Sequence, residues 1–322
     1  MERYNKLLTA ILLAGATFTA SADSIKLEVG AWTAGTGDAD TETHYFDKFT
    51  FSSFDPVSTY LDPDLSAGLQ NGTPVMVFDT ATDITVGLLN VDPLPVPADT
   101  EGFNDFSGYK ITADYELAGF AGFVDGSGGG SLDGTLDGEA LGATFLDGYF
   151  KLYIQSIGAG GVLGAKTEVL MIDGITSVAN LSGAEISLEL NGDVTSVLAG
   201  TIFRELPIGG KTDLKDILDD AAPDLVIKAK ADTEFDGTAL PTPPAAPKLI
   251  GDFTTFQKDF FFANSGGATL AAALPALQVL ERTTTLTSAN LEFSVVPEPA
   301  SLALFGAGLF GIGFAARKRR QS

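Results

Sequence analysis

The feature that most constrains the fold of this chain is a regular alternation of apolar and polar residues, which recurs in segments separated by Gly- and Asp-rich turns. A period of two places every second side chain on one face of a β-strand. The apolar sets that share a face in this way are Ile25, Leu27 and Val29; Tyr109, Ile111, Ala113, Tyr115 and Leu117; Phe150, Leu152 and Ile154; Ile186, Leu188 and Leu190; and Ala289, Leu291, Phe293 and Val295. Many short strands joined by turns predict a mainly β chain folded as an antiparallel β-sandwich.

Shorter segments extend this pattern. Further strands are predicted at residues 75–78, 169–172, 225–229 and 253–262. The Asn191-Gly192 pair follows one alternating segment and predicts a turn.

One segment has helical rather than strand periodicity. Residues 211–222 place their apolar side chains three and four apart, and Pro223 follows. This spacing predicts a short helix that caps one end of the sandwich. Two Pro-rich segments, 92–97 and 240–248, predict loop or linker. We treat residues 23–296 as one β-rich domain that contains both Pro-rich segments.

The N-terminus has the three parts of a cleavable signal peptide. Arg3 and Lys6 precede an apolar stretch over residues 7–18, and small residues follow at Ala20 and Ala22. Signal peptidase is therefore expected to remove residues 1–22 and to leave Asp23 as the first residue of an exported protein. The apolar stretch is shorter than the roughly 20 residues of a membrane-spanning helix, which disfavours the alternative of an uncleaved anchor.

Three features follow one another at the C-terminus. A short motif and an uncharged, Gly-rich segment at 300–316 precede a basic cluster; the motif is Pro297, Glu298 and Pro299, and the cluster is Arg317, Lys318, Arg319 and Arg320. As a transmembrane helix, residues 300–316 would be about 25 Å long, enough for a thin span. Basic clusters stay on the cytoplasmic side of a membrane, so residues 23–296 are expected on its outer side. The signal peptide directs them to the same side.

Residues 297–322 resemble the PEP-CTERM sorting signal of Gram-negative bacteria, which has a Pro-Glu-Pro motif, a short span and an Arg-rich cluster in this order. The resemblance implies that a membrane enzyme, the exosortase, processes the tail near the motif. The inner membrane would then hold the chain only during sorting, before it reaches the cell surface or extracellular matrix. An ordinary tail anchor is the alternative, because hydropathy alone does not separate the two.

Charge and cysteine content exclude several classes of function. Without residues 1–22 and 300–322, the chain has 13 basic and 41 acidic residues, a formal balance of −28. Nucleic-acid binding needs clustered Lys and Arg, so no nucleic-acid partner is expected. The chain has no Cys, which excludes disulfides, thiolate metal sites and a Cys nucleophile.

Two acidic segments are candidate metal sites. Alternation would place Asp38, Asp40, Glu42 and His44 on one face of an extended backbone, where they could bind a cation. A Gly-rich segment contains Asp125, Asp133 and Asp137 and approaches a calcium-binding repeat, although Ser131 departs from it and the unit does not recur. Solvated acidic loops explain both segments, so no cofactor is expected, and Ca²⁺ is the alternative.

One strand face carries a candidate sugar contact. Tyr149, Lys151 and Tyr153 are expected opposite the apolar face of the same strand. Two rings about 13 Å apart could stack on sugars, with a lysine between them for acidic groups. The alternative is that these residues simply suit a half-exposed sheet or lie under a second layer.

These observations predict a non-enzymatic surface or extracellular-matrix protein. The resemblance to PEP-CTERM proteins implies that an exosortase sorts it and that it is associated with exopolysaccharide, biofilm or floc formation. His44 is the only histidine and no Gly-x-Ser-x-Gly elbow occurs, so no catalytic residues are predicted. Residues 108–111, 147–154 and 282–296 also resemble, in pattern, flocculation-associated PEP-CTERM proteins, which are exported and β-rich. The alternatives are a carbohydrate-binding module and a secreted glycan hydrolase, which would need two carboxylates facing a cleft.

Overall fold

Antiparallel strands make up most of the part of the chain that the structure, a computed structural model, describes. The described residues are 24–33, 41–46, 48–51, 54–62, 74–89, 103, 108–124, 140–182, 185–206, 209–219, 225–236, 250–264, 278–283 and 285–297. The mainly β character predicted from the sequence is confirmed.

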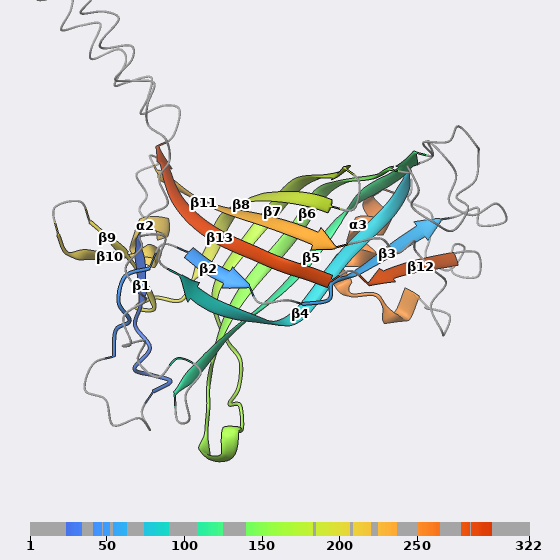
Figure 1. Cartoon of the computed structure of the whole chain (residues 1–322). Helices are drawn as coiled ribbons and strands as arrows, with labels where there is room; N and C mark the ends of the chain where they lie inside the picture. The colour runs from blue at the N-terminus through green and yellow to red at the C-terminus, as the bar shows by residue number, and fades with distance from the viewer. Residues whose placement is uncertain are drawn as a thin grey trace, which may run out of the picture.

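The strands form one large and one small sheet (Figure 1). The large sheet contains β2 (Lys48–Phe51), β3 (Val57–Asp62), β4 (Val75–Leu89), β5 (Tyr109–Val124), β6 (Ala140–Ser156), β7 (Thr167–Ser182), β8 (Glu185–Val197), β11 (Leu225–Asp236), β12 (Gln278–Thr283) and β13 (Thr285–Pro297). The small sheet contains β1 (Ile25–Leu27), β9 (Ile202–Glu205) and β10 (Lys211–Asp213). The helical elements are η1 (Ala159–Gly161), α2 (Leu214–Asp219), η2 (Ile250–Asp252) and α3 (Thr255–Asn264).

The large sheet closes on itself. Pairings run from β4 through β5, β6, β7, β8, β11, β13 and β2 back to β4, and all of them are antiparallel. Strands β2 and β3 lie one after the other along the same side of β4. Strand β13 pairs with β2 and strand β12 pairs with β3, in one register that runs from Lys48 opposite Glu292 to Asp62 opposite Gln278. The last described strand, β13, therefore completes the sheet against β2, one of the first.

This closure corrects the predicted sandwich. A sandwich has two sheets packed face to face, whereas here one sheet curves until its ends pair. Both arrangements bury one face of every strand, so both produce the same alternation of apolar and polar residues. Only the β4–β5 and β2–β13 pairings distinguish them.

The apolar residues predicted to share a face line the interior of the closed sheet. Ile111, Leu117, Leu152 and Ile154 have at most 1% of their surface exposed. Each such side chain contributes about 2 kcal/mol of burial free energy. The inward faces of β5 and β6 therefore carry much of the core, as the alternation predicted.

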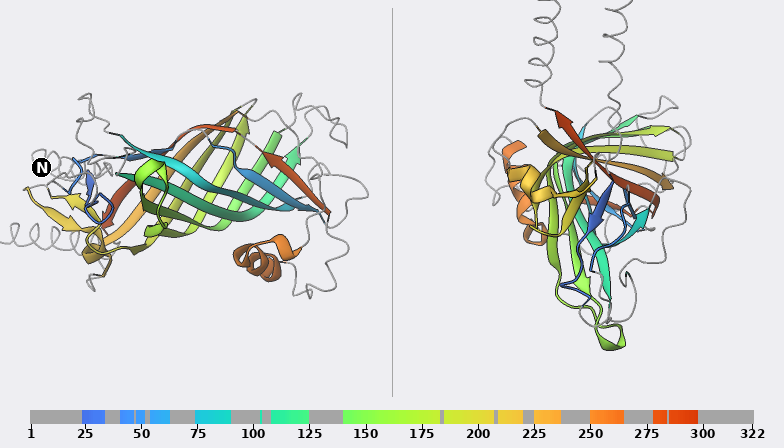
Figure 2. Two further views of the ribbon diagram at one scale, coloured as in Figure 1. Left: turned by 90° about the horizontal axis from the view of Figure 1, so that it is seen from below. Right: turned by 90° about the vertical axis from the view of Figure 1, so that its left-hand side faces the viewer.

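Helix α3 corrects a second prediction, because residues 253–262 were expected to form a strand. The Thr254 hydroxyl accepts a hydrogen bond from the Gln257 N–H at 3.2 Å, and the Gln257 side chain accepts one from the Thr254 N–H at 3.1 Å. This reciprocal pair is a capping box, which favours helix initiation. Phe260 and Phe261 then pack on Phe78 of β4, which faces away from the interior. Figure 2 shows α3 outside the closed sheet.

The predicted turn at Asn191-Gly192 is also wrong, because β8 runs through it. A Cβ atom at Gly192 would lie 2.6 Å from Cγ2 of Ile172 and 2.9 Å from Cγ1 of Ile175. Glycine is needed here because β7 bulges towards this position, between Asp173 and Thr176. The residue signals a close approach of two strands rather than a change of direction.

The helix predicted over residues 211–222 is confirmed in part, as α2, whereas residues 211–213 form β10 and residues 220–222 lie outside the described residues. Leu214 is buried, and Ile217 and Leu218 pack partly against the main core. The Asp213 carboxylate accepts a hydrogen bond from the Lys215 N–H at 2.9 Å at the start of the helix. Among the described residues, no helix is long and apolar enough to cross a membrane.

Candidate functional site

The C-terminal motif begins where the large sheet ends. Pro297 is the last residue of β13 and lies opposite Leu225 of β11. The other C-terminal residues of interest, Glu298, Pro299, the 300–316 segment and Arg317 to Arg320, lie outside the described residues, as do Ala20, Ala22 and Asp23. The motif thus begins within the folded sheet, at the last residue of β13.

The candidate sugar-contact residues lie together on the outer face of β6. The Tyr149 hydroxyl donates a hydrogen bond to Glu116 Oε1 of β5 at 2.7 Å, and the Thr254 hydroxyl donates to the other oxygen of Glu116 at 2.6 Å. The Tyr149 ring meets Phe256 of α3 edge-on, with 5.5 Å between ring centres. The segment around α3 therefore covers one side of Tyr149.

The lysines of this face also have partners within the protein. Lys151 Nζ lies 3.1 Å from Glu168 of β7 and 5.3 Å from the centre of the Tyr149 ring. Lys166 Nζ lies 4.8 Å from the centre of the Tyr153 ring and forms ion pairs with Asp83 at 2.8 Å and Asp114 at 3.0 Å. A sugar that stacked on either ring would compete with these contacts, and the sugar contact itself stays a prediction.

The pKa values on this face follow from burial and neighbouring charges. Partial burial and then the hydrogen bond to Glu116 raise the pKa of Tyr149. Partial burial lowers the pKa of Lys151, but its contacts with Glu168 outweigh this and leave the pKa raised. At neutral pH the tyrosine is therefore a neutral hydrogen-bond donor and the lysine a cation.

A polar cluster that sequence analysis did not single out lies inside the large sheet. We call it the interior cluster and define it as Ser58, Tyr60, Asp79, Tyr115 and Arg282. Asp79 of β4 accepts hydrogen bonds from the Ser58 hydroxyl at 2.5 Å and from the Tyr115 hydroxyl at 2.7 Å. Ser58 lies opposite both Asp79 and Arg282, so this row spans β12, β3 and β4.

Burial dominates the electrostatics of the interior cluster. Asp79 is 3% exposed and Arg282 is 4% exposed. Removal from water raises the pKa of Asp79, although hydrogen bonds from Ser58 and Tyr115 and the charge of Arg282 oppose this. Burial, and then the nearby Asp79, raises the pKa of Tyr115 well above its usual value. The cluster can hold a proton and a charge away from solvent.

The sequence carried only part of the signal for this cluster. Asp79 is in phase with the apolar Val75, Val77 and Ala81, and Tyr115 belongs to an alternating set that was recognised as buried. A carboxylate in the middle of an inward-facing row is the sign that was missed. Its pairing with Ser58 and Arg282 depends on strand register, which links residues far apart in the chain.

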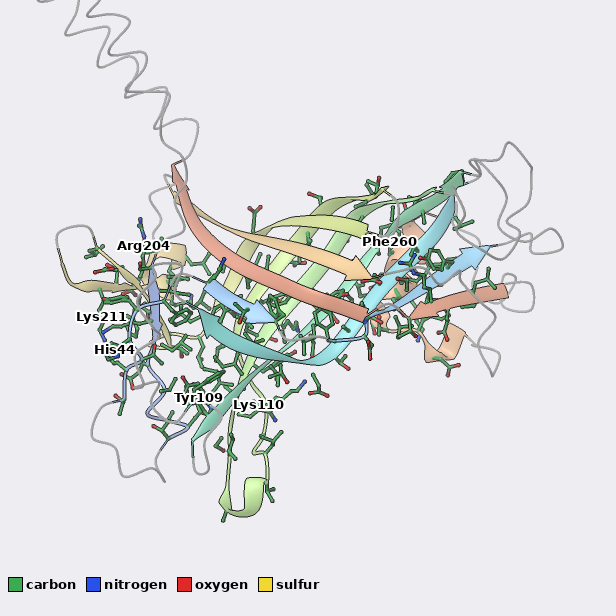
Figure 3. All side chains as sticks on the ribbon, in the orientation of Figure 1. His44, Tyr109, Lys110, Arg204, Lys211 and Phe260 are labelled. Atoms are coloured by element: carbon green, nitrogen blue, oxygen red, sulfur yellow. The ribbon has the colours of Figure 1, made fainter. Side chains whose placement is uncertain are left out.

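The first candidate metal segment is only partly described. His44 lies at the end of the molecule that carries the small sheet, near Lys211 (Figure 3). Glu42 forms ion pairs with Lys26 and Lys211, and His44 is exposed. Asp38 and Asp40 lie outside the described residues, as do Asp125, Asp133 and Asp137 of the second segment. Within the described part of the chain, no group of three or more His, Asp or Glu residues could hold a metal. Ca²⁺ binding stays a prediction.

Comparison with known proteins identifies the tail. The profile of the PEP-CTERM protein-sorting motif matches residues 295–320, so the chain carries this motif. The match supports an exported protein that exosortase processes at the membrane before surface localisation. No curated protein and no solved structure matches the chain.

Proposed function

We propose that this chain is a non-enzymatic surface or extracellular-matrix protein, sorted by an exosortase system, that acts in exopolysaccharide, biofilm or floc structure. The observation that carries the proposal is the sorting motif at residues 295–320, which begins within the last three residues of β13, the closing strand of the sheet. In this proposal the sheet is the delivered part and the tail is removed during sorting.

The charge of the delivered part supports a role in a hydrated matrix. Its formal balance of −28 attracts cations, and divalent ions could bridge its carboxylates to those of an acidic polysaccharide. On the outer face of β5, β6 and β7, tyrosines, lysines and carboxylates alternate within contact distance. Such a face offers both rings and charges to a polysaccharide.

Mass spectrometry of the C-terminus tests the sorting step. In cells with the exosortase, the surface form should end near residues 297–300, and in cells without it the full tail should remain. A triple variant, P297A/E298A/P299A, should also retain its tail, whereas Lys258→Ala on α3 serves as a control that should be processed normally. Intact peptides ending at Ser322 on the delivered protein would identify the tail as a plain anchor.

Deletion of the gene tests the matrix role separately. Cells that lack the protein should release more exopolysaccharide into the medium or form weaker flocs, and the wild-type gene should restore both. The non-enzymatic role would be contradicted if the purified protein released sugar from a glycan and one carboxylate substitution, such as Asp79→Asn, abolished that release.

A further inference from the structure

The C-terminal end of β13 has a strand on one side only, within the part of the chain that the structure describes. Pairing with β11 continues to Pro297, which lies opposite Leu225. Pairing with β2 stops five residues earlier, at Glu292 opposite Lys48. No described residue pairs with residues 293–297 on the side that β2 occupies further along the strand, and we call this side of residues 293–297 the open edge.

The course of the N-terminal segment explains why this edge is open. Before β2, Phe46 exchanges backbone hydrogen bonds of 2.7 and 2.8 Å with Ile25 of β1. The Thr43 N–H then donates to the Leu27 carbonyl at 2.9 Å. The segment that would have continued along β13 is thus paired with the small sheet.

The first four residues of the open edge, 293–296, lack the usual protection against strand addition. Exposed edge strands commonly carry charged residues, prolines or bulges that prevent another strand from pairing. Residues 293–296 are Phe, Ser, Val and Val, which are uncharged and mostly of high β-propensity, and the first proline is Pro297. Four steps of about 3.4 Å make an edge of about 14 Å, and every second residue directs its N–H and C=O to the open side.

We propose that the enzyme that processes the tail binds this edge, by adding an extended segment of its own as a strand alongside residues 293–297. The inference rests on the proposed function and names the surface that the enzyme recognises. The sorting-motif match begins at Val295, so it overlaps the edge and joins it to the tail. Backbone pairing gives affinity for an extended partner without requiring a large side-chain pocket.

Two proline variants of the full-length chain, Ser294→Pro and Val295→Pro, test this surface. Adjacent residues of a strand direct their N–H groups to opposite sides, so one proline removes a bond to β11 and the other removes a donor from the open edge. Protease resistance of the membrane-bound precursor identifies the variant that keeps the fold. Processing of that variant by exosortase should be about tenfold slower than that of the wild type, the effect of one lost backbone hydrogen bond.

A charge substitution provides a second variant in case both prolines unfold the sheet. Ser294→Lys places on the edge the kind of residue that blocks strand addition, and it should also slow processing about tenfold. Asn290→Lys is the matched control, because Asn290 has Thr50 of β2 on one side and Asp232 of β11 on the other. Processing of the control should equal that of the wild type.

The outcomes separate the two proposals. Equal processing of the wild type and the folded edge variants would overturn the edge inference and leave the sorting function intact. If exosortase leaves the wild-type tail uncut, the proposed function itself fails. A third outcome is that the wild type forms a dimer, that Ser294→Lys disrupts this dimer, and that processing stays at the wild-type rate. This outcome would assign the edge to a second copy of the chain and overturn the inference.

Discussion

Two neighbouring residues of β5 form the same kind of hydrogen bond, one on the inner and one on the outer face of the sheet. Tyr115 points inward and donates a hydrogen bond of 2.7 Å to Asp79. Glu116 points outward and accepts one of 2.7 Å from Tyr149. Both are bonds between a tyrosine hydroxyl and a carboxylate, and their lengths are equal. They differ in their access to water.

This difference determines what each contact contributes. Asp79 is buried, so its carboxylate depends on Ser58, Tyr115 and Arg282 for the interactions that water would supply. On the outer face, water can replace a lost partner of Glu116. A lost partner inside leaves a buried polar group without compensation, which costs more than the net value of the bond.

The largest expected effect is the loss of the interior cation. Arg282→Met should lower the free energy of unfolding by about 3 kcal/mol, because it leaves the buried Asp79 without its nearby positive charge. Lys151→Met, which removes an ion pair on the outer face, should cost less than about 1 kcal/mol. Urea denaturation of the purified exported protein measures both. Equal losses would show that burial does not separate the two sites.

The tyrosine pair gives the second contrast. Tyr115→Phe should destabilise the protein by about 2 kcal/mol, because Asp79 loses a buried donor. Tyr149→Phe should cost about 0.5 kcal/mol, because water can reach Glu116. The same denaturation measurement applies, and a larger loss for Tyr149→Phe would reverse the comparison.

The pH dependence of stability sharpens the contrast further. Burial raises the pKa of Asp79 in the folded state above its value in the unfolded chain, about 3.9. Between these two values the folded state binds more protons, so this residue's contribution to stability falls as pH rises and stays lost above the folded-state pKa. Asp79→Asn should remove that fall, whereas Tyr149→Phe should retain it. If the stability of the wild type rose relative to Asp79→Asn over this interval, the sign would be wrong.

The smallest expected effect concerns ligand binding at the outer face. If the outer face of β6 contacts polysaccharide, Tyr153→Ala should weaken binding to an acidic polysaccharide by about two- to tenfold. Tyr115→Phe is the interior control and should leave the affinity unchanged. Calorimetric titration would measure both, and equal affinity for the wild type and Tyr153→Ala would remove Tyr153 from the contact.

Local chemistry explains which predictions from the sequence succeeded. Parts of β5 and β6, at residues 109–117 and 149–154, and the short helix α2 were recognised because neighbouring residues set their periodicity. Helix α3 was predicted as a strand because its four phenylalanines, at 256 and 260–262 and beside Phe253, suit either structure. The Thr254–Gln257 capping box was the local signal that would have separated them.

The sequence alone determined the mainly β class, the inward faces of the strands and the sorting motif, because each depends on residues close together in the chain. Tertiary structure decided that the sheet closes between β2 and β13 and that Asp79 lies in one row with Ser58 and Arg282. It also decided that no described residue pairs with residues 293–297 on the open edge. These features depend on strand register between segments as far apart as Lys48 and Glu292. Alternation fixes which face of a strand is buried, but it is the same for every partner that the strand could pair with.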